Sequence, residues 1–429
     1  MRVLIVGSGG REHALARRLQ QSASVSSVWA IPGHDAMARD GVTCLPGSPT
    51  DAAAVLDAAR AAQADLIVVG PEAPLVAGVA DALRAAGFAV FGPGREGARL
   101  EGSKAWAKAF MQRHGIPTAR AATFRDFAQA EAHIRRLPLP PVVKVDGLAA
   151  GKGVTVARTH DEALAAARAA LVEGAFGAAG RSIVIEERLE GVELSVLAVL
   201  DGQSYRLLPA AQDHKTLLEG GRGPNTGGMG AYSPVPFASD EQLSLIEQRV
   251  FAPALAGLRA EGIDYRGVLY AGLMLTATGP YVLEFNCRFG DPEAQAVLPR
   301  LRGDFGRLLW AAATGTLAGQ PIDVRPEAAV CVILASRGYP GRYETGHPIE
   351  GLERLAGLSD VFVDHAGTRL DGGTWRTAGG RVLGITALGR DLTSARQRAY
   401  AACACVRFSG MHYRRDIAAP PSQPPSGTR

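Results

Sequence analysis

The segment from Glu284 to Glu293 gathers side chains that bind metals and anions. The apolar run before it predicts a strand that ends in Glu284 and Asn286, which are two residues apart and so point to one face. Carboxylate and amide oxygens on one face are suitable ligands for Mg²⁺, and two such ligands leave other coordination positions of the ion free for phosphates. Arg288 adds a planar fork for a carboxylate or phosphate. We interpret the segment as a magnesium and anion site; the alternative is a surface strand end with paired charges.

A second cluster joins lysines to glycines. Lys144 ends a predicted strand, and the loop after it holds Gly147, Gly151 and Gly153. Glycine lets the backbone approach a phosphate, and a strand-borne lysine supplies a fixed positive charge. The loop is not of the Walker A type, because the glycine gap is too short and no Ser or Thr follows Lys152. A phosphate-binding loop is favoured over a flexible surface hairpin.

Three further motifs are ambiguous when each is taken alone. The turn Gly7 to Glu12 lacks the third glycine of a dinucleotide fingerprint, so it predicts either an anion-binding turn or a plain turn, and not an NAD site. Gly70 to Leu75 follows a strand where ligands of α/β sheets bind, but, taken alone, it is better explained as a rigid proline turn. Glu186 to Glu193 offers carboxylates for ribose hydroxyls, although, taken alone, a solvated acidic turn explains it better.

Composition limits the class of protein. The 429 residues carry 46 Lys+Arg against 42 Asp+Glu, and an excess of +4 argues against a dedicated nucleic-acid binder. The five cysteines are odd in number and irregularly spaced, which predicts no disulfide framework and a reducing, cytoplasmic setting. No run of about 18 apolar residues occurs, so we expect no transmembrane helix.

The elements that must position these motifs fall into three predicted domains. Residues 1–102 alternate strands and helices, which is typical of an α/β domain with a parallel sheet. Expected strands cover 3–6, 28–31, 65–69 and 89–91, and expected helices cover 12–21, 51–62 and 76–86. A helix over 104–114 is expected at the start of the next domain.

The second predicted domain spans 103–327. Its strands at 141–145, 154–156 and 182–187 and its helix at 161–172, capped by Asp161, predict a small α+β lid over about 120–190. Two strands are expected between 192 and 208, a helix over 242–260 and a hairpin over 269–285. We expect 212–232, with six glycines, to be one long functional loop.

A small C-terminal α+β domain is expected over 328–417. Its predicted strands are 330–334, 361–363 and 382–388, and a helix is expected over 394–405. The tail 418–429 is rich in proline without a periodic apolar pattern, which predicts disorder.

Taken together, the motifs resemble those of the ATP-grasp ligases, and most closely the phosphoribosylamine–glycine ligase family, to about residue 417. The resemblance rests on ordered matches at 9–14, 70–75, 100–104, 146–153, 212–215, 223–232, 284–293 and 365–368. It implies a parallel-sheet (Rossmann-like) N-terminal domain and ATP-grasp central domains with a mobile lid. It also implies a reaction of purine synthesis, in which ATP phosphorylates the carboxylate of glycine and 5-phosphoribosylamine attacks the acyl phosphate.

By this resemblance, each motif acquires an expected role. ATP would be held by Lys104, Lys144, Gly147, Gly151, Gly153, Glu186, Glu187, Leu189 and Glu193. Mg²⁺, or Mn²⁺, would be bound by Glu284 and Asn286. Catalytic positioning of glycine and the acyl phosphate would fall to Arg288, Asp213 and Asp291, with Asn225 and Gly228 in the glycine-rich loop. Phosphoribosylamine would lie at Gly9, Gly10 and Glu72.

Two positions depart from the family pattern, namely His34-Asp35, where Asn is usual, and Ala418, where Gly is usual. The first weakens a ribose-phosphate role for that turn. The expected binding partners are the two substrates, and no binding to nucleic acid or membrane is expected. The protein is expected to be a monomer or a weak dimer. The rivals are an ATP-grasp ligase for another amine, a catalytically silent nucleotide-binding protein, and a Rossmann dehydrogenase, which Glu12 argues against.

Overall fold

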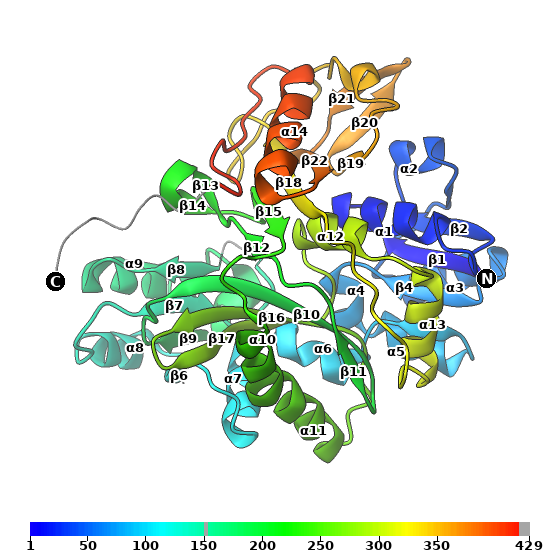
Figure 1. Ribbon diagram of the computed structural model, residues 1–429. Helices are drawn as coiled ribbons and strands as arrows, with labels where there is room; N and C mark the ends of the chain where they lie inside the picture. Colours follow the sequence, from blue (N-terminus) through cyan, green and yellow to red (C-terminus); the bar gives the residue numbers. More distant parts are fainter. Residues whose placement is uncertain (150–152, 420–429) are drawn as a thin grey trace.

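The computed structural model describes residues 1–149 and 153–419, and Figure 1 shows their arrangement. The N-terminal part is a parallel sheet of five strands in the order β3-β2-β1-β4-β5. The strands are β1 (Arg2–Gly7), β2 (Ser27–Pro32), β3 (Thr43–Cys44), β4 (Leu66–Val69) and β5 (Ala89–Phe91). Both β1 and β4 are apolar and buried along their length, as expected for strands covered on both faces. This confirms the predicted Rossmann-like domain.

The strand order reverses between β1 and β4, so a crevice opens beyond their carboxyl ends. Five helices connect the strands: α1 (Gly10–Gln20), α2 (Asp35–Arg39), α3 (Ala52–Ala61), α4 (Glu72–Ala77) and α5 (Val79–Ala85). The glycine turn before α1 and the proline turn before α4 therefore face each other across that crevice. This topology explains why two separate short motifs belong to one site.

A four-stranded antiparallel sheet, β6-β9-β7-β8, follows in the chain. The elements of this part of the chain are α6 (Arg95–Gly102), α7 (Lys104–Arg113), β6 (Ala121–Phe124), α8 (Phe127–Ile134), β7 (Val142–Val145), β8 (Val154–Val156), α9 (His160–Leu171) and β9 (Ile183–Glu186). Helices α8 and α9 pack on this sheet and share a separate hydrophobic core with it. Helix α9 is capped by Thr159, whose hydroxyl accepts from the amide of Glu162, and not by Asp161.

A second antiparallel sheet has the strand order β11-β10-β16-β17 (Figure 1). It comprises β10 (Val192–Asp201), β11 (Tyr205–Leu207), β16 (Arg266–Thr276) and β17 (Gly279–Asn286). The helix predicted over 242–260 is interrupted: α10 (Asp240–Ile246) passes through a π turn into α11 (Ala252–Ala260), where Pro253 occupies the first turn. Proline has no amide hydrogen to continue a helical ladder, which accounts for the break.

The prediction of one long loop over 212–232 is wrong. The segment forms β12 (Gln212–Asp213), β13 (Thr216–Leu218), β14 (Arg222–Asn225) and β15 (Gly230–Ser233). Strand β15 pairs with β18 (Ala328–Ala335) of the C-terminal part, so its backbone hydrogen bonds come from a strand almost 100 residues later. The glycines concealed these strands because glycine is unfavourable in strand interiors.

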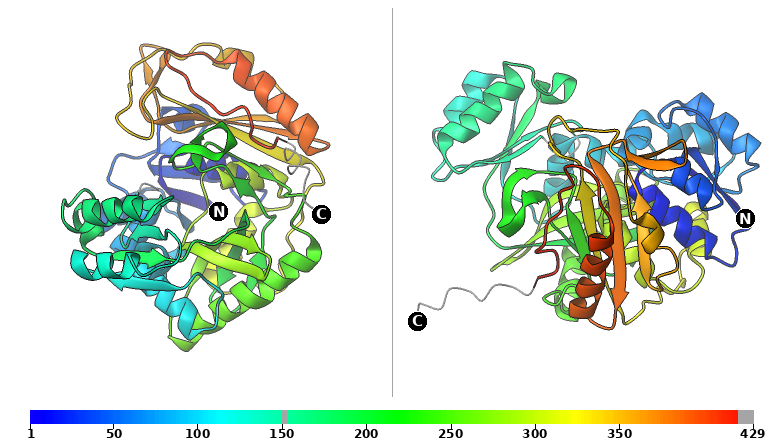
Figure 2. Two further views of the ribbon diagram at one scale, coloured as in Figure 1. Left: turned by 90° about the vertical axis from the view of Figure 1, so that its left-hand side faces the viewer. Right: turned by 90° about the horizontal axis from the view of Figure 1, so that it is seen from above.

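The C-terminal sheet has the order β12-β15-β18-β22-β19, so it includes two strands from before residue 328. The remaining elements are α12 (Glu293–Val297), α13 (Phe305–Thr314), β19 (Val361–His365), β20 (Thr368–Asp371), β21 (Thr374–Thr377), β22 (Arg381–Gly389) and α14 (Leu392–Cys405). Figure 2 shows α14 lying along one face of this sheet and the β6–β9 sheet projecting away from the rest. The predicted disordered tail lies, from residue 420, outside the described residues.

No helix within residues 1–149 and 153–419 has the length and apolar character needed to span a membrane.

Candidate active site

The N-terminal glycine turn is organised around Glu12. Its carboxylate accepts from the amide of Gly9 at 2.6 Å and from Nε of Arg11 at 2.6 Å, and the side chain is almost fully buried. A Cβ at Gly70 would lie 2.2 Å from Glu12 Oε1, and one at Gly7 would lie 2.7 Å from Cγ. Glycine is thus required at both turns so that Glu12 can fit between them, which explains why the dinucleotide pattern is broken at this position.

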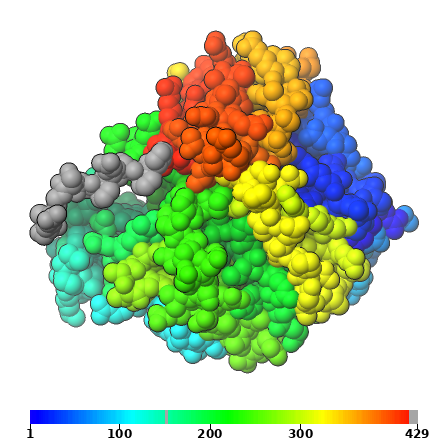
Figure 3. Space-filling model, in the orientation of Figure 1, coloured from blue at the N-terminus to red at the C-terminus, as the bar shows by residue number. Residues whose placement is uncertain are grey.

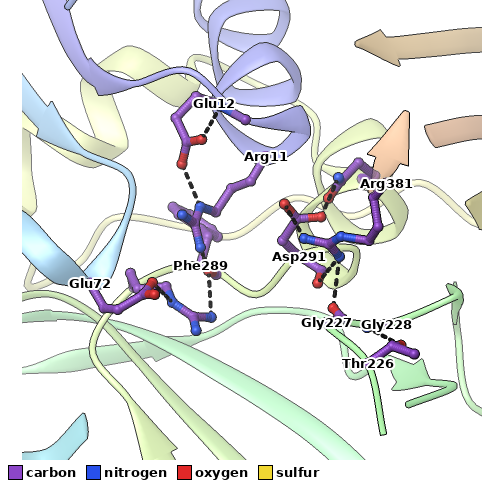
Figure 4. Close-up of polar contacts among 12 residues, drawn as sticks. Arg11, Glu12, Glu72, Thr226, Gly227, Gly228, Phe289, Asp291 and Arg381 are labelled. Atoms are coloured by element: carbon purple, nitrogen blue, oxygen red, sulfur yellow. Dashed lines mark hydrogen bonds and ion pairs between the residues drawn. The ribbon is translucent and has the colours of Figure 1, made fainter. Parts of the chain in front are cut away.

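Arg11 and Arg288 join this crevice to the segment after β17, and Figure 4 shows Arg11 beside Phe289 of that segment. Arg11 Nη1 donates to the carbonyl of Phe289 at 3.1 Å. The guanidinium of Arg288 donates to Glu72 Oε2 at 3.2 Å and to Asn286 Oδ1 at 3.2 Å, and it lies 2.8 Å from Glu101 Oε1. The predicted substrate residue Glu72 and the predicted catalytic residue Arg288 are therefore in direct contact.

Glu101, which the sequence did not single out, fixes the end of β17. Its second oxygen accepts from the amide of Cys287 at 2.7 Å, and its side chain is 8% exposed. Burial raises the pKa of Glu101, while the charge of Arg288 acts in the opposite direction. Burial works against the charge of Arg288, yet the carboxylates of Glu101 and Glu72 raise its pKa overall. The two residues form a buried ion pair at the centre of the site.

The predicted phosphate lysines converge from two elements. Lys144 Nζ, on β7, donates to the carbonyl of Leu283 at 2.9 Å and lies 3.0 Å from Glu186 Oε2. Lys104 Nζ, at the start of α7, donates to the carbonyl of Gly147 at 3.2 Å. Burial lowers the pKa of Lys104, and the carboxylate of Glu284 partly offsets this. Both lysines thus lie close to Gly147, at the start of the predicted phosphate-binding loop, or to the end of β17.

Lys108 is a third lysine at this point, missed from the sequence because only the fold brings it there. Its Nζ lies 3.0 Å from the same oxygen of Glu186 and donates to Thr118 Oγ1 at 2.7 Å. Burial lowers the pKa of Lys108 to about 8. Glu186, predicted to contact adenine and ribose, is buried and shared between Lys108 and Lys144. Its other oxygen has no hydrogen-bond partner among the described residues.

The other residues predicted for ATP lie along the connection from β9 to β10. Glu187 pairs with Arg120 at 2.8 Å, Leu189 is half-buried, and Glu193 Oε2 lies 2.9 Å from Lys215 Nζ. Gly151 lies outside the described residues, whereas Gly147 and Gly153 flank it. A cavity of about 400 Å³ borders Asp146 and Gly147, with arginines 125 and 181 in its wall.

Glu284 lies among several cations. Burial alone would raise its pKa, but the charges of Lys215, Lys144 and Lys104 hold the pKa of Glu284 below its ordinary value. The carboxylate is therefore ionised. Asn286 is buried two residues later on the same strand and accepts only from Arg288 among the described residues. No group of three His, Cys, Asp or Glu side chains in the described part of the chain could form a metal cage by itself.

A network of side-chain hydrogen bonds connects β12, β10, β16 and α12. Ser195 Oγ donates to Asp213 Oδ1 at 3.4 Å and lies 3.0 Å from the hydroxyl of Tyr270, which donates to Glu293 Oε1 at 2.7 Å. Burial raises the pKa of Asp213 to about 7, although the charge of Lys215 opposes this. Only Asp213 and Glu293 were visible as motif residues, because Ser195 and Tyr270 lie in otherwise apolar strands.

The glycine-rich loop meets the C-terminal sheet through Arg381. Its Nη1 donates to the carbonyls of Gly227 at 2.7 Å and Asp291 at 2.8 Å, and Nη2 lies 3.1 Å from the carboxylate of Asp291 (Figure 4). The predicted catalytic residue Asp291 is thus an anchor for Arg381. The sequence offered one signal for it, the pair Gly379-Gly380 directly before the arginine. Asn225 is half-buried at the end of β14.

Gly228 allows a direct test of the loop. Its φ is +107°, and a Cβ there would lie 2.5 Å from Cδ of Pro292. We expect Gly228→Ala to destabilise the protein by about 1–3 kcal/mol and to impair catalysis, because the backbone strain and the clash act together. Gly221→Ala is the matched control, since φ there is +71° but no atom lies within 4 Å. Thermal melting and turnover would be compared, and equal effects of the two changes would refute a role for the close contact.

Three comparisons with known proteins agree with this geometry. Family profiles described as phosphoribosylglycinamide synthetase match in order: the N domain at 1–101, the ATP-grasp (A) domain at 102–294 and the C domain at 329–420. The fold is also similar to a biotin carboxylase domain from Hydrogenobacter thermophilus, with a TM-score of 0.72 at 18% identity over 96% of this chain and 91% of that one. The chain therefore belongs to the class of proteins with the ATP-grasp fold.

Closer relatives define the family. The chain is 47% identical to the phosphoribosylamine–glycine ligase of Rhizobium meliloti over 97% of this chain and 98% of the relative. It is 49% identical to the trifunctional purine biosynthetic protein adenosine-3 of Gallus gallus over 97% of this chain and 42% of that protein. The crystal structure of a phosphoribosylamine–glycine ligase from Thermotoga maritima superimposes with a TM-score of 0.83 at 35% identity, covering 97% and 100% of the two chains. This chain belongs to the phosphoribosylamine–glycine ligase family.

Proposed function

We propose that the chain joins glycine to 5-phosphoribosylamine in de novo purine synthesis, with ATP as phosphoryl donor and glycyl phosphate as intermediate. The carboxylate of glycine takes the γ-phosphoryl group and ADP leaves. The amine then attacks the acyl carbon, loses a proton and expels phosphate, giving glycinamide ribonucleotide. The observation that carries the proposal is the ionised Glu284 between the lysines of the phosphate side and the Arg288 cluster of the substrate side.

The ATP side has its charges arranged in advance. Lys104 and Lys144 are held by backbone carbonyls of the elements that they serve, so their ammonium groups need little reorganisation when phosphates arrive. We assign the loop from Gly147 through Gly151 to Gly153 to the phosphates. Adenine and ribose are assigned to the connection that carries Glu186, Glu187, Leu189 and Glu193. Because Glu186 already holds two lysines, its part in this set is to position them.

Glu284 and Asn286 would hold Mg²⁺, with Mn²⁺ as an alternative. The donor set fits, because one ionised carboxylate and one amide oxygen leave coordination positions for phosphate oxygens, as magnesium sites require. The metal would neutralise charge on the transferring phosphoryl group. Around it, the chain's own residues exclude water and orient the donor, since Asn286 is buried and Leu283 is tied to Lys144.

Glycine and the amine are assigned to the opposite side of Glu284. Arg288 and Asp213 would orient the carboxylate and ammonium ends of glycine, beside Asn225 and Gly228 of the loop. Gly9, Gly10 and Glu72 line the crevice at the strand-order reversal and would hold phosphoribosylamine. Asp291 contributes by fixing Arg381 against that loop.

We also propose that the chain is divided into the three predicted domains and that residues of about 120–190 form a lid. The separate core of the β6–β9 sheet supports a unit that can move as one body. A monomer or weak dimer and a cytoplasmic location remain predictions; sedimentation velocity would measure the first.

A phosphate-release assay with each substrate omitted in turn tests the function. Release should require ATP, glycine and phosphoribosylamine together. Equal turnover with another amine would favour a ligase of different specificity, and no release with all three substrates present would favour a silent nucleotide-binding protein.

Glycine binding should depend on pH through Asp213. A carboxyl group with its pKa raised to about 7 is neutral below that pH and cannot pair with the glycine ammonium. We expect KM for glycine to rise about tenfold per pH unit below 7. The measurement is KM for glycine from pH 5.5 to 8.5, with Asp213→Asn as the variant that should lose this dependence. A flat wild-type profile would contradict the assignment.

A further inference from the structure

A cavity of about 570 Å³ lies away from the candidate active site, on the far flank of α1. It is enclosed by the second half of α1, the segment 298–303 after α12, residue 325 and the start of β19. Figure 3 shows the N-terminal residues in blue, the residues near 300 in yellow and the C-terminal part in orange meeting on this face. Three regions of the chain therefore contribute to one hollow.

The wall of this cavity is strongly basic. Four arginines line it, Arg17, Arg18, Arg302 and Arg325, against one carboxylate, Asp360. Asp360 lies 3.9 Å from a different arginine, Arg398. The cavity thus carries a surplus of positive charge in a chain whose whole formal net charge is only +4.

Most of this charge is uncompensated. Arg17 is neutralised by Asp364, at 2.6 Å, but Arg18, Arg302 and Arg325 form no ion pair within residues 1–149 and 153–419. Arg18 is only 7% exposed and donates to the carbonyl of Gly303, while its Nε and that of Arg325 have no acceptor in the described chain. The carboxylate of Asp304 acts on Arg18 through its charge, but it already accepts hydrogen bonds from Ser24 and from the backbone of α13.

The buried position of Arg18 is unfavourable without an anion. Burial lowers the pKa of Arg18, and the neighbouring charge of Arg325 lowers it further. Like charges at close range repel most strongly where water is excluded. A bound anion with several acceptor oxygens would reverse the sign of this interaction, because a guanidinium fork matches phosphate geometry.

Apart from Gln21, the remaining side chains of the wall are apolar, and they favour a ligand larger than an inorganic ion. Leu301, Phe362 and Leu388 line it, and the guanidinium of Arg17 lies 4.8 Å from the ring centroid of Phe362. The volume falls within the range of about 300–1,000 Å³ that is typical of small-molecule sites. A sugar or base could pack on these side chains while the arginines hold a phosphate.

We propose that this cavity is a second ligand site, which binds a phosphate ester of nucleotide size. The site is separate from the reaction centre but shares α1 with it. Arg17 and Arg18 lie near the carboxyl end of that helix, and Gly10 and Arg11 lie at its start. Arg17 also holds Asp364, whose neighbour His365 donates its amide to His13 on α1. A ligand here would brace the N-terminal sheet against the C-terminal sheet.

Calorimetric titration tests the site. The probe is AMP, added to full-length protein already saturated with Mg²⁺ and ADP so that the proposed ATP site is filled. We expect one AMP per chain, binding at least about tenfold more tightly than inorganic phosphate, and a higher midpoint of thermal unfolding. Equal affinity for AMP and phosphate would overturn the requirement for a nucleotide-sized ligand, and no AMP binding would overturn the site.

The variant Arg302→Gln, Arg325→Gln removes two charges that make no side-chain hydrogen bond in the described chain, so the fold should persist. AMP affinity should fall at least about tenfold, while turnover without AMP stays at the wild-type value. The matched control, Arg136→Gln with Arg259→Gln, removes two exposed arginines elsewhere and should bind AMP normally. Equal AMP binding by the cavity variant and wild type, or equal losses in both double variants, would disprove the assignment.

Discussion

Replacing Glu284 with alanine is expected to lower kcat by about a thousand-fold or more, while the protein remains folded. The carboxylate is the proposed metal ligand, and loss of several kcal/mol of charge stabilisation corresponds to a factor of this size. The lysines around Glu284 retain other partners: Lys144 keeps Glu186 and Lys215 keeps Glu193. The loss should therefore be confined to catalysis, as measured by phosphate release and by thermal melting.

The conservative variant Glu284→Gln separates a metal role from a structural one. It keeps the shape of the side chain but removes its charge, so the Mg²⁺ concentration needed for half-maximal rate should rise. Glu353→Ala, at an exposed position in the C-terminal part, controls for the loss of one negative charge. Wild-type rates in Glu284→Ala, or an unchanged Mg²⁺ requirement in Glu284→Gln, would refute the metal assignment.

The sequence predicted the parts of the site that are local. Glu284 and Asn286 are two residues apart on one strand, so their shared face followed from strand geometry alone. The crevice between the turns at Gly7 and Gly70 followed from the alternation of strands and helices. In each case the residues that make the feature are close in the sequence or are ordered by a rule of topology.

The parts that the sequence missed depend on contacts over long separations. Lys108 lies on an ordinary helix and becomes part of the site only because β9 places Glu186 against it. Arg381 follows Gly227 by more than 150 residues. Strand β15 of the 212–232 segment was missed because its partner β18 is distant, and no local pattern identifies a distant partner. The other three strands of the segment pair within it, but they are short and lie in a glycine-rich stretch. The role predicted for Glu186 was based on its acidic neighbours in the sequence. That prediction could not take into account the two lysines that the fold places beside Glu186.

The largest expected effect on stability comes from Arg288→Met. The change leaves Glu101 buried without its ion-pair partner, and loss of one member of a buried pair costs about 3–5 kcal/mol. Glu72 loses its partner as well, and the fork proposed for glycine disappears, so turnover should fall about a hundredfold or more. The midpoint of thermal unfolding and the rate of phosphate release measure the two effects.

The pH dependence distinguishes an unpaired charge from lost packing. Burial already raises the pKa of Glu101, and without Arg288 that pKa should rise further. A group whose pKa is higher in the folded than in the unfolded state stabilises the protein at low pH and loses this contribution as pH rises through the folded value. The deficit of Arg288→Met relative to wild type should therefore be larger at pH 8 than at pH 5.5.

The double variant Glu101→Gln, Arg288→Met tests whether the unpaired charge of Glu101 causes the loss of stability. Removing the carboxylate as well as its partner leaves only the partly exposed Glu72 without its ion-pair partner, so much of the stability should return and most of its extra pH dependence should vanish. Activity should not return, because the guanidinium fork that we propose to orient glycine is still missing. A deficit that is the same at every pH, with no recovery in the double variant, would show that Arg288 acts through packing instead of through its charge.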